Sequence, residues 1–173
     1  MEESLFDNQV KDPVFDQFNY HFREKILSIC PLLGKFQIRI LPTIDLIEAQ
    51  IITEEEIATQ AFLNHIEKTE DDASQTLAYI VKNEEVIKML DFTLDEQFSA
   101  IAHEIGHFLF FFHSNKEGAG GQSEEIIADK YACDLGLKEP LMRVLNKLQG
   151  TTWYSDGIYR QITNRLFWLE NYL

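Results

Sequence analysis

Hydrophobic residues recur every three or four positions in several stretches of the chain, a spacing typical of amphipathic helices. Two of these stretches begin at Thr53 and Thr93, each followed three residues later by a glutamate, which is the spacing of a capping box. The pattern predicts helices over residues 12–30, 53–68, 93–113, 139–150 and 158–173, and another from residue 123 or 124 to residue 136.

Alternation of hydrophobic and polar residues predicts the strands. Residues 35–41 fit a half-buried strand, and residues 76–81 and 86–90 fit a hairpin, one strand of which we expect at an edge of the sheet. Residues 44–52 fit either a short strand or a turn of helix. The expected fold is α+β and a single domain over residues 1–173. A small mixed or antiparallel sheet packs on the helices at 93–113 and 123–136, and further helices follow at the C-terminal end.

The helix predicted over residues 93–113 contains the sequence His103-Glu104-Ile105-Gly106-His107. Residues four apart on a helix lie one turn apart on the same side, so His103 and His107 can direct two imidazoles at one point. The other side of this helix carries an apolar stripe of Leu94, Phe98, Ile101, Ile105, Leu109 and Phe112. The two histidines are therefore candidate ligands of one zinc ion, with a structural histidine pair as the simpler alternative.

The next predicted helix supplies acidic residues that complete such a site. It carries the pattern E-x-x-A-D, which begins at Glu125 and ends at Asp129. Glu125 is the candidate third ligand, and the fourth position would hold a water whose pKa zinc lowers to about 7. Glu104 is the candidate general base. Asp129 is placed to accept the free N–H of a ligating histidine, and His103 is the favoured partner.

The two motifs together resemble those of the gluzincin metallopeptidases, and the short chain is similar to minimal gluzincins and to the bacterial ImmA/IrrE-type regulatory metallopeptidases. The resemblance covers roughly residues 76–137. It implies one Zn²⁺ ion with His103, His107 and Glu125 as ligands. It also implies Glu104 as the base and Asp129 as the carboxylate that orients a ligand.

Two features differ from the thermolysin-like members of that group. Those enzymes place an asparagine before the ligand glutamate, where this chain has Glu124. They also use a separate His or Tyr to stabilise the oxyanion, and no motif assigns one here. Tyr154 and Tyr159 could donate a hydrogen bond to an oxyanion, and His113 could reach the mouth of the site, although packing or surface exposure is the simpler interpretation of each.

Charge and composition limit the kinds of partner and the cellular location that we expect for this protein. The chain has 15 Lys and Arg against 29 Asp and Glu, a formal charge of −14, which predicts repulsion from nucleic acid and anionic membranes. The sequence lacks an apolar run of membrane-spanning length, and its first ten residues lack the features of a secretory signal. With only two cysteines, we expect reduced thiols and a cytoplasmic location.

These observations predict a zinc-dependent endopeptidase that acts on a protein or peptide. One alternative is a zinc-binding regulatory or interaction module with little or no turnover. Another is a zinc amidase of the deformylase kind, which shares H-E-x-x-H but takes a cysteine ligand from an upstream motif. The upstream cysteine here, Cys30, lacks the glycine-rich context expected of that ligand.

Overall fold

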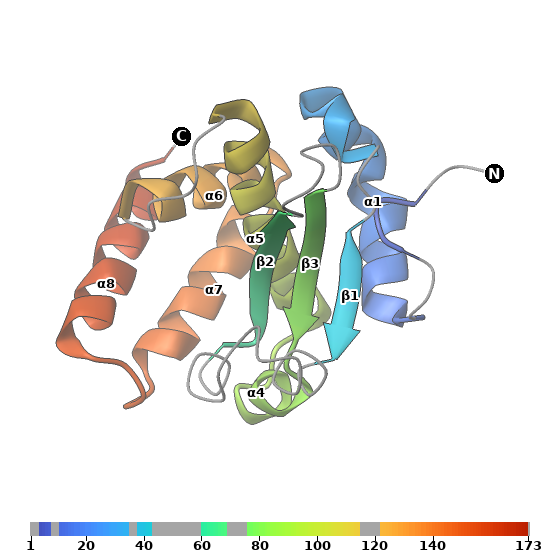
Figure 1. Cartoon of the computed structure of the whole chain (residues 1–173). Helices are drawn as coiled ribbons and strands as arrows, with labels where there is room; N and C mark the ends of the chain where they lie inside the picture. Colours follow the sequence, from blue (N-terminus) through green and yellow to red (C-terminus); the bar gives the residue numbers. More distant parts are fainter. Residues whose placement is uncertain are drawn as a thin grey trace.

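The structure is a computed structural model that describes residues 4–7, 11–34, 38–42, 60–68, 76–114 and 122–172. The elements are α1 (Pro13–Ile29), the 3₁₀ turn η1 (Pro31–Gly34), β1 (Arg39–Pro42), β2 (Phe62–Lys68), β3 (Thr76–Lys82), α4 (Glu84–Met89), α5 (Leu94–Ser114), α6 (Gln122–Asp134), α7 (Lys138–Gln149) and α8 (Asp156–Asn171). The predicted α+β class is confirmed, because these helices accompany a small mixed sheet (Figure 1).

The described strands form a sheet in the order β1-β3-β2. β1 runs parallel to β3, whereas β2 pairs antiparallel with β3 along its whole length, from Phe62 opposite Lys82 to Lys68 opposite Thr76. Figure 1 shows α5 behind the sheet, α1 beside β1, and α6, α7 and α8 on the side of β2. β2 is therefore the edge strand that faces the helices of the candidate site. The expectation that a strand within residues 76–90 forms this edge is wrong, because β3 is the central strand of the described sheet.

Two predicted elements are wrong. The predicted helix over residues 53–68 is contradicted at its C-terminal end, which is β2; residues 53–59 lie outside the described part of the chain. The spacing of apolar residues in this short stretch fits the repeat of a helix as well as that of a strand. Pairing with β3 makes it a strand. The predicted hairpin strand at residues 86–90 is instead largely helix α4. Asn83 caps this helix, since its side chain accepts hydrogen bonds from the backbone N–H groups of Glu85 and Val86 at 3.1 and 3.3 Å.

Local signals at several other helix ends are confirmed. Asp12 caps α1 by accepting a hydrogen bond from the backbone of Val14 at 2.9 Å. The predicted capping box at the start of α5 forms both of its hydrogen bonds. The backbone N–H of Thr93 donates to Glu96 at 2.9 Å, and that of Glu96 donates to the Thr93 hydroxyl at 3.3 Å. Gly150 ends α7 as expected. The predictions for residues 35–37, 44–52 and 69–75 lie outside the described residues.

Helix α5 lies at the centre of the core. Ile101, Ile105, Phe108 and Leu109 are at most 2% exposed, so the helix is buried on more than the one predicted stripe. The stripe's first residue, Leu94, is 39% exposed at the helix start. Burial of both sides fixes α5 between the sheet and the C-terminal helices.

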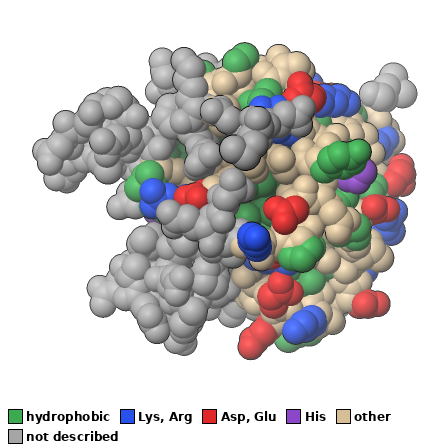
Figure 2. Space-filling model, turned by 90° about the vertical axis from the view of Figure 1, so that its right-hand side faces the viewer, with side chains coloured by type: hydrophobic (Ala, Val, Ile, Leu, Met, Phe, Trp, Pro, Cys, Tyr) green, Lys and Arg blue, Asp and Glu red, His purple; other side chains and the backbone are tan. Residues whose placement is uncertain are grey.

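The molecular surface beside α1 mixes charges with small apolar areas (Figure 2). On the described part of this face, acidic and basic side chains are intermixed, and no broad basic area is visible. No helix among the described residues combines the length and apolar character needed to cross a membrane.

Candidate metal centre

Three side chains from two helices converge at one point. His103 and His107 project from α5, and their Nε2 atoms lie 3.2 Å apart. Glu125 projects from α6, with one carboxylate oxygen 3.3 Å from Nε2 of His103 and the other 3.5 Å from Nε2 of His107. One ligand atom from each residue lies within 4.8 Å of the others, so this group could hold a metal ion. Two imidazole nitrogens and a carboxylate oxygen are a donor set that suits zinc.

A glycine brings the two helices close enough for this convergence. A Cβ built at Gly106 would lie 2.7 Å from Cα and 2.9 Å from the carbonyl oxygen of Ala128 on α6. Ala128 is fully buried at this contact. The small residues in both motifs therefore permit a close backbone approach that places Glu125 opposite the histidines.

Each histidine has a carboxylate partner on its other ring nitrogen. Nδ1 of His103 lies 2.8 Å from Asp129, which is the contact expected from the sequence. Nδ1 of His107 lies 3.0 Å from the carboxylate of Glu124. The sequence did not indicate that Glu124 is the partner of His107. A carboxylate can only accept at neutral pH, so both Nδ1 atoms carry a proton and the Nε2 atoms are the ones that face the position of a metal ion.

Arg165 of α8 is a buried cation that the sequence reasoning missed. Its guanidinium donates to both carboxylate oxygens of Asp129 at 2.6 and 2.8 Å, and to Glu125 at 2.8 Å. The sequence carried one signal for it: Arg165 lies between Ile162 and Leu169 at the spacing of the apolar face of α8, where arginine is rare without a buried partner.

The hydrogen bonds and charges around the candidate ligands favour the ionised form of the Glu125 carboxylate and the protonated form of His103. Burial raises the pKa of Glu125, but its hydrogen bond with His103 and the charges around it outweigh burial and hold the pKa well below its usual range. Burial and Arg165 lower the pKa of His103, yet hydrogen bonds to Asp129 and Glu125 prevail and raise the pKa to about 10. A metal ion binding here therefore competes with a proton on His103.

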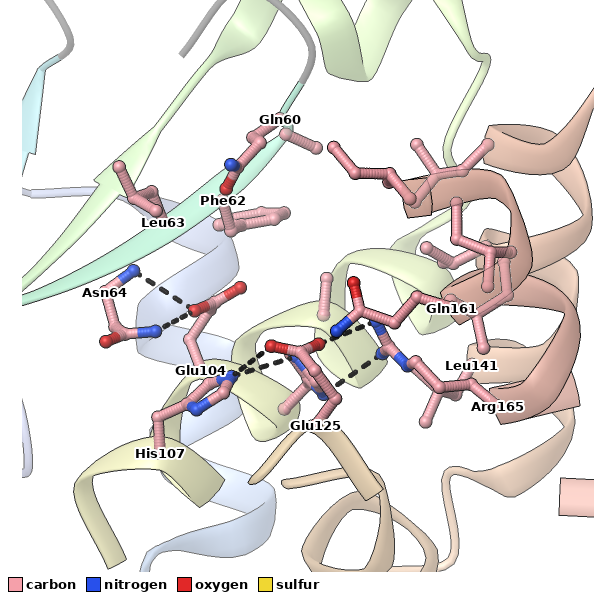
Figure 3. Close-up of a pocket in the computed structure, with 18 of the residues that line it drawn as sticks. Gln60, Phe62, Leu63, Asn64, Glu104, His107, Glu125, Leu141, Gln161 and Arg165 are labelled. Carbon is pink, nitrogen blue, oxygen red and sulfur yellow. Dashed lines mark hydrogen bonds and ion pairs between the residues drawn. The ribbon is translucent and has the colours of Figure 1, made fainter. Parts of the chain in front are cut away.

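Glu104 lies beside the three candidate ligands and is only 9% exposed. One of its carboxylate oxygens accepts hydrogen bonds from the backbone N–H and the side-chain amide of Asn64, at 3.1 and 2.6 Å. Figure 3 shows Asn64 reaching Glu104 from the strand, while Arg165 reaches Glu125 from the opposite side of the site. Sequence reasoning did not select Asn64, because it assigned this stretch to a helix.

A cavity of about 410 Å³ opens beside these residues. Its polar wall includes His103, Glu104, His107, Glu124, Glu125 and Arg165. Its apolar wall includes Leu141, Val144, Leu145 and Leu148 of α7 and Ile158 and Ile162 of α8. A molecule in this cavity could therefore contact the polar residues with one part and α7 and α8 with an apolar part.

The other candidate residues are placed less centrally. Tyr154 lines the cavity, whereas Tyr159 is 47% exposed and is not among the lining residues. The side chain of His113 lies outside the described part of the structure. Within the described residues, the group that could hold a metal ion contains no cysteine, and Cys30 is buried in the core. The deformylase-type ligand set therefore receives no support from the geometry.

Comparison with known proteins leaves this site to be interpreted from its own geometry. No family model, no curated protein and no solved structure matches the chain.

Proposed function

We propose that this protein is a zinc-dependent endopeptidase that hydrolyses peptide bonds in a protein or peptide substrate. The observation that carries the proposal is the convergence of His103, His107 and Glu125, with Glu104 beside them on the wall of one cavity. A structural histidine pair needs neither a third donor nor a neighbouring carboxylate in a cavity, whereas the proposed zinc-dependent hydrolysis uses both.

His103, His107 and Glu125 would hold the ion through Nε2, Nε2 and carboxylate oxygen. When bound there, zinc supplies Lewis-acid polarisation of the scissile carbonyl and lowers the pKa of a coordinated water. Asp129 and Glu124 orient the two imidazoles by accepting their Nδ1 protons. Arg165 donates a hydrogen bond to one oxygen of Glu125 and so would hold this carboxylate in place beside the two histidines.

Glu104 performs the proton transfers. Its carboxylate accepts a proton from the attacking water as the new C–O bond forms at the scissile carbonyl. The same carboxyl group then returns a proton to the leaving nitrogen as the C–N bond breaks. No proton is gained or lost over the cycle, so Glu104 is regenerated as the ionised base.

The resemblance to gluzincins and ImmA/IrrE-type metallopeptidases and the lining of the cavity support the proposed substrate class. The apolar wall formed by α7 and α8 suits a peptide better than a small polar molecule. The ImmA/IrrE-like resemblance favours a regulatory target inside the cell. Nucleic acid and anionic membrane are disfavoured by the charge of −14.

The decisive variant is Glu104→Gln, which keeps the side chain's size and removes the base. Zinc-loaded wild-type protein should cleave casein, an unstructured protein, and Glu104→Gln should lower kcat by about 100-fold or more while elemental analysis finds the same zinc content. The matched control is Glu170→Gln on α8, whose side chain is exposed and which should cleave casein like the wild type.

The same experiment tests the binding-module alternative. If the wild-type protein binds one zinc ion but neither it nor Glu104→Gln cleaves casein or a peptide library, the endopeptidase proposal fails and the binding module stands. If the wild-type protein binds no zinc, both proposals fail.

A further inference from the structure

We infer that Asn64 is a positioning residue for Glu104: it holds one carboxylate oxygen against the edge strand and leaves the other for the proton transfers. This inference rests on the proposed function, because it gives Asn64 a role only if Glu104 acts as a base. It concerns a residue outside both motifs and in a different layer of the fold.

The contact is specific in its chemistry. Two donors of Asn64, the backbone N–H and the side-chain amide, converge on the same oxygen, Oε2 of Glu104. The 2.6 Å contact to a carboxylate oxygen requires a donor, so the amide nitrogen, not the amide oxygen, faces Glu104. In Figure 3 the second oxygen of Glu104 is turned away from Asn64.

The position of Asn64 on the sheet explains why its backbone is available. β2 pairs with β3 on one side only, because it is the edge strand of the described sheet. The backbone N–H of Asn64 points to Glu104 instead of to β3. The Glu104 carboxylate therefore contacts the side of β2 that does not pair with β3. This contact joins α5 to β2 next to the candidate ligands.

This arrangement restricts a flexible side chain. A glutamate has three side-chain torsions, and an untethered one loses considerable conformational entropy when it must reach one orientation. Two charge-assisted hydrogen bonds to one oxygen fix those torsions before the substrate arrives. Correct placement of a reacting group within a fraction of an ångström has large effects on rate, whereas it contributes little to substrate affinity.

Two variants separate positioning from packing. Asn64→Ala keeps the backbone donor and removes the side-chain donor, so kcat for casein cleavage should fall about 10-fold with little change in KM. Asn64→Asp keeps the side chain's shape but places a carboxylate against Glu104, so kcat should fall further. The control is His65→Ala, which should keep wild-type kcat. His65 lies on the same strand, but its side chain is on the opposite face from Asn64 and contacts Tyr79.

A second readout does not depend on turnover. Acetohydroxamic acid binds an accessible metal ion as its anion, acetohydroxamate, and gives up a proton that a neighbouring base can accept. Its affinity for the Co²⁺-loaded protein can be followed by visible absorption. We expect Asn64→Ala to weaken this binding several-fold in the wild-type background. In the Glu104→Gln background it should have no further effect, because the residue that Asn64 positions no longer acts as a base.

The outcomes distinguish this inference from the proposed function. If the wild-type protein cleaves casein and binds acetohydroxamate but both Asn64 variants match it, the inference alone is overturned. It is also overturned if the effects of Asn64→Ala and Glu104→Gln simply add, or if the Asn64 variants lose metal or melt at a much lower temperature than His65→Ala. If the wild-type protein neither cleaves casein nor binds acetohydroxamate, the proposed function fails, and the inference fails with it.

Discussion

Arg165 is a buried cation that contacts two carboxylates, Glu125 and Asp129, from a helix that carries neither motif. Its side chain is 11% exposed and that of Asp129 is fully buried, so solvent screens this ion pair weakly. The bidentate contact with Asp129 also fixes the carboxylate that orients His103. Arg165 thus acts on the candidate metal centre through two neighbours at once.

Replacing Arg165 with methionine tests its contribution. Arg165→Met keeps much of the side chain's length and apolar stem but leaves Asp129 buried without its cation. We expect the free energy of unfolding in urea at pH 7 to fall by about 3–5 kcal/mol.

Arg160→Met on the same helix provides the control, because Arg160 is exposed, and it should change stability by less than about 0.5 kcal/mol. Equal stability of the two variants would show that the buried ion pair contributes nothing net.

At the scale of elements, the contact between α5 and α6 determines whether the three candidate ligands can meet. The two helices supply all three candidate ligands, and Gly106 sets how close the two backbones come. The contact is fixed by backbone atoms of Ala128, which cannot rotate away as a flexible side chain would. The distance between the two helices is therefore sensitive to a single methyl group.

We predict that Gly106→Ala destabilises the protein and weakens metal binding. A methyl group 2.7 Å from Ala128 Cα forces the helices apart, at a cost of about 1–3 kcal/mol in unfolding free energy. This exceeds the gain of up to about 1 kcal/mol from alanine's higher helix propensity. Zinc affinity, measured by competition with a chromophoric chelator, should fall together with stability.

Gly157→Ala is the matched control for this change. A Cβ there meets no atom closer than 3.9 Å, so the substitution should leave both stability and zinc affinity close to those of the wild type. If Gly106→Ala binds zinc as tightly as Gly157→Ala, close helix approach does not determine the site geometry.

At the scale of the whole molecule, the candidate site lies where the sheet edge, α5, α6 and α8 meet. β2 contributes Asn64, α5 contributes the histidines and Glu104, and α8 contributes Arg165. A metal ion bound by α5 and α6 would add a bond between elements that hydrogen bonds and packing already join. Binding should therefore be linked to global stability.

We predict that zinc raises the melting temperature. At a free concentration about 100 times Kd, a single site that binds only the folded state stabilises it by about 2.7 kcal/mol. For a chain of this size, that corresponds to an increase of roughly 5–10 °C by calorimetry. EDTA should reverse the increase, and His107→Ala should abolish it. A melting temperature that does not respond to zinc in the wild type would argue against a metal centre here.

Some features of this protein can be predicted from the sequence alone, because they depend on residues that lie close together in the chain. The spacing of His103 and His107 puts both imidazoles on one side of a helix without any tertiary information. Thr93 and Glu96 start that helix through contacts three residues apart. The α+β class and the grouping of Glu125 with the two histidines also agree with the structure.

Only the tertiary structure decided the remaining features, because they depend on partners distant in the chain. Residues 62–68 became a strand through pairing with β3, and that outcome brought Asn64 to Glu104, forty residues later. Arg165 found Asp129 and Glu125 because α8 packs beside α6. Helical period and capping are set within a few residues, whereas strand pairing and the partner of a buried charge are set by which surfaces the folded chain brings together.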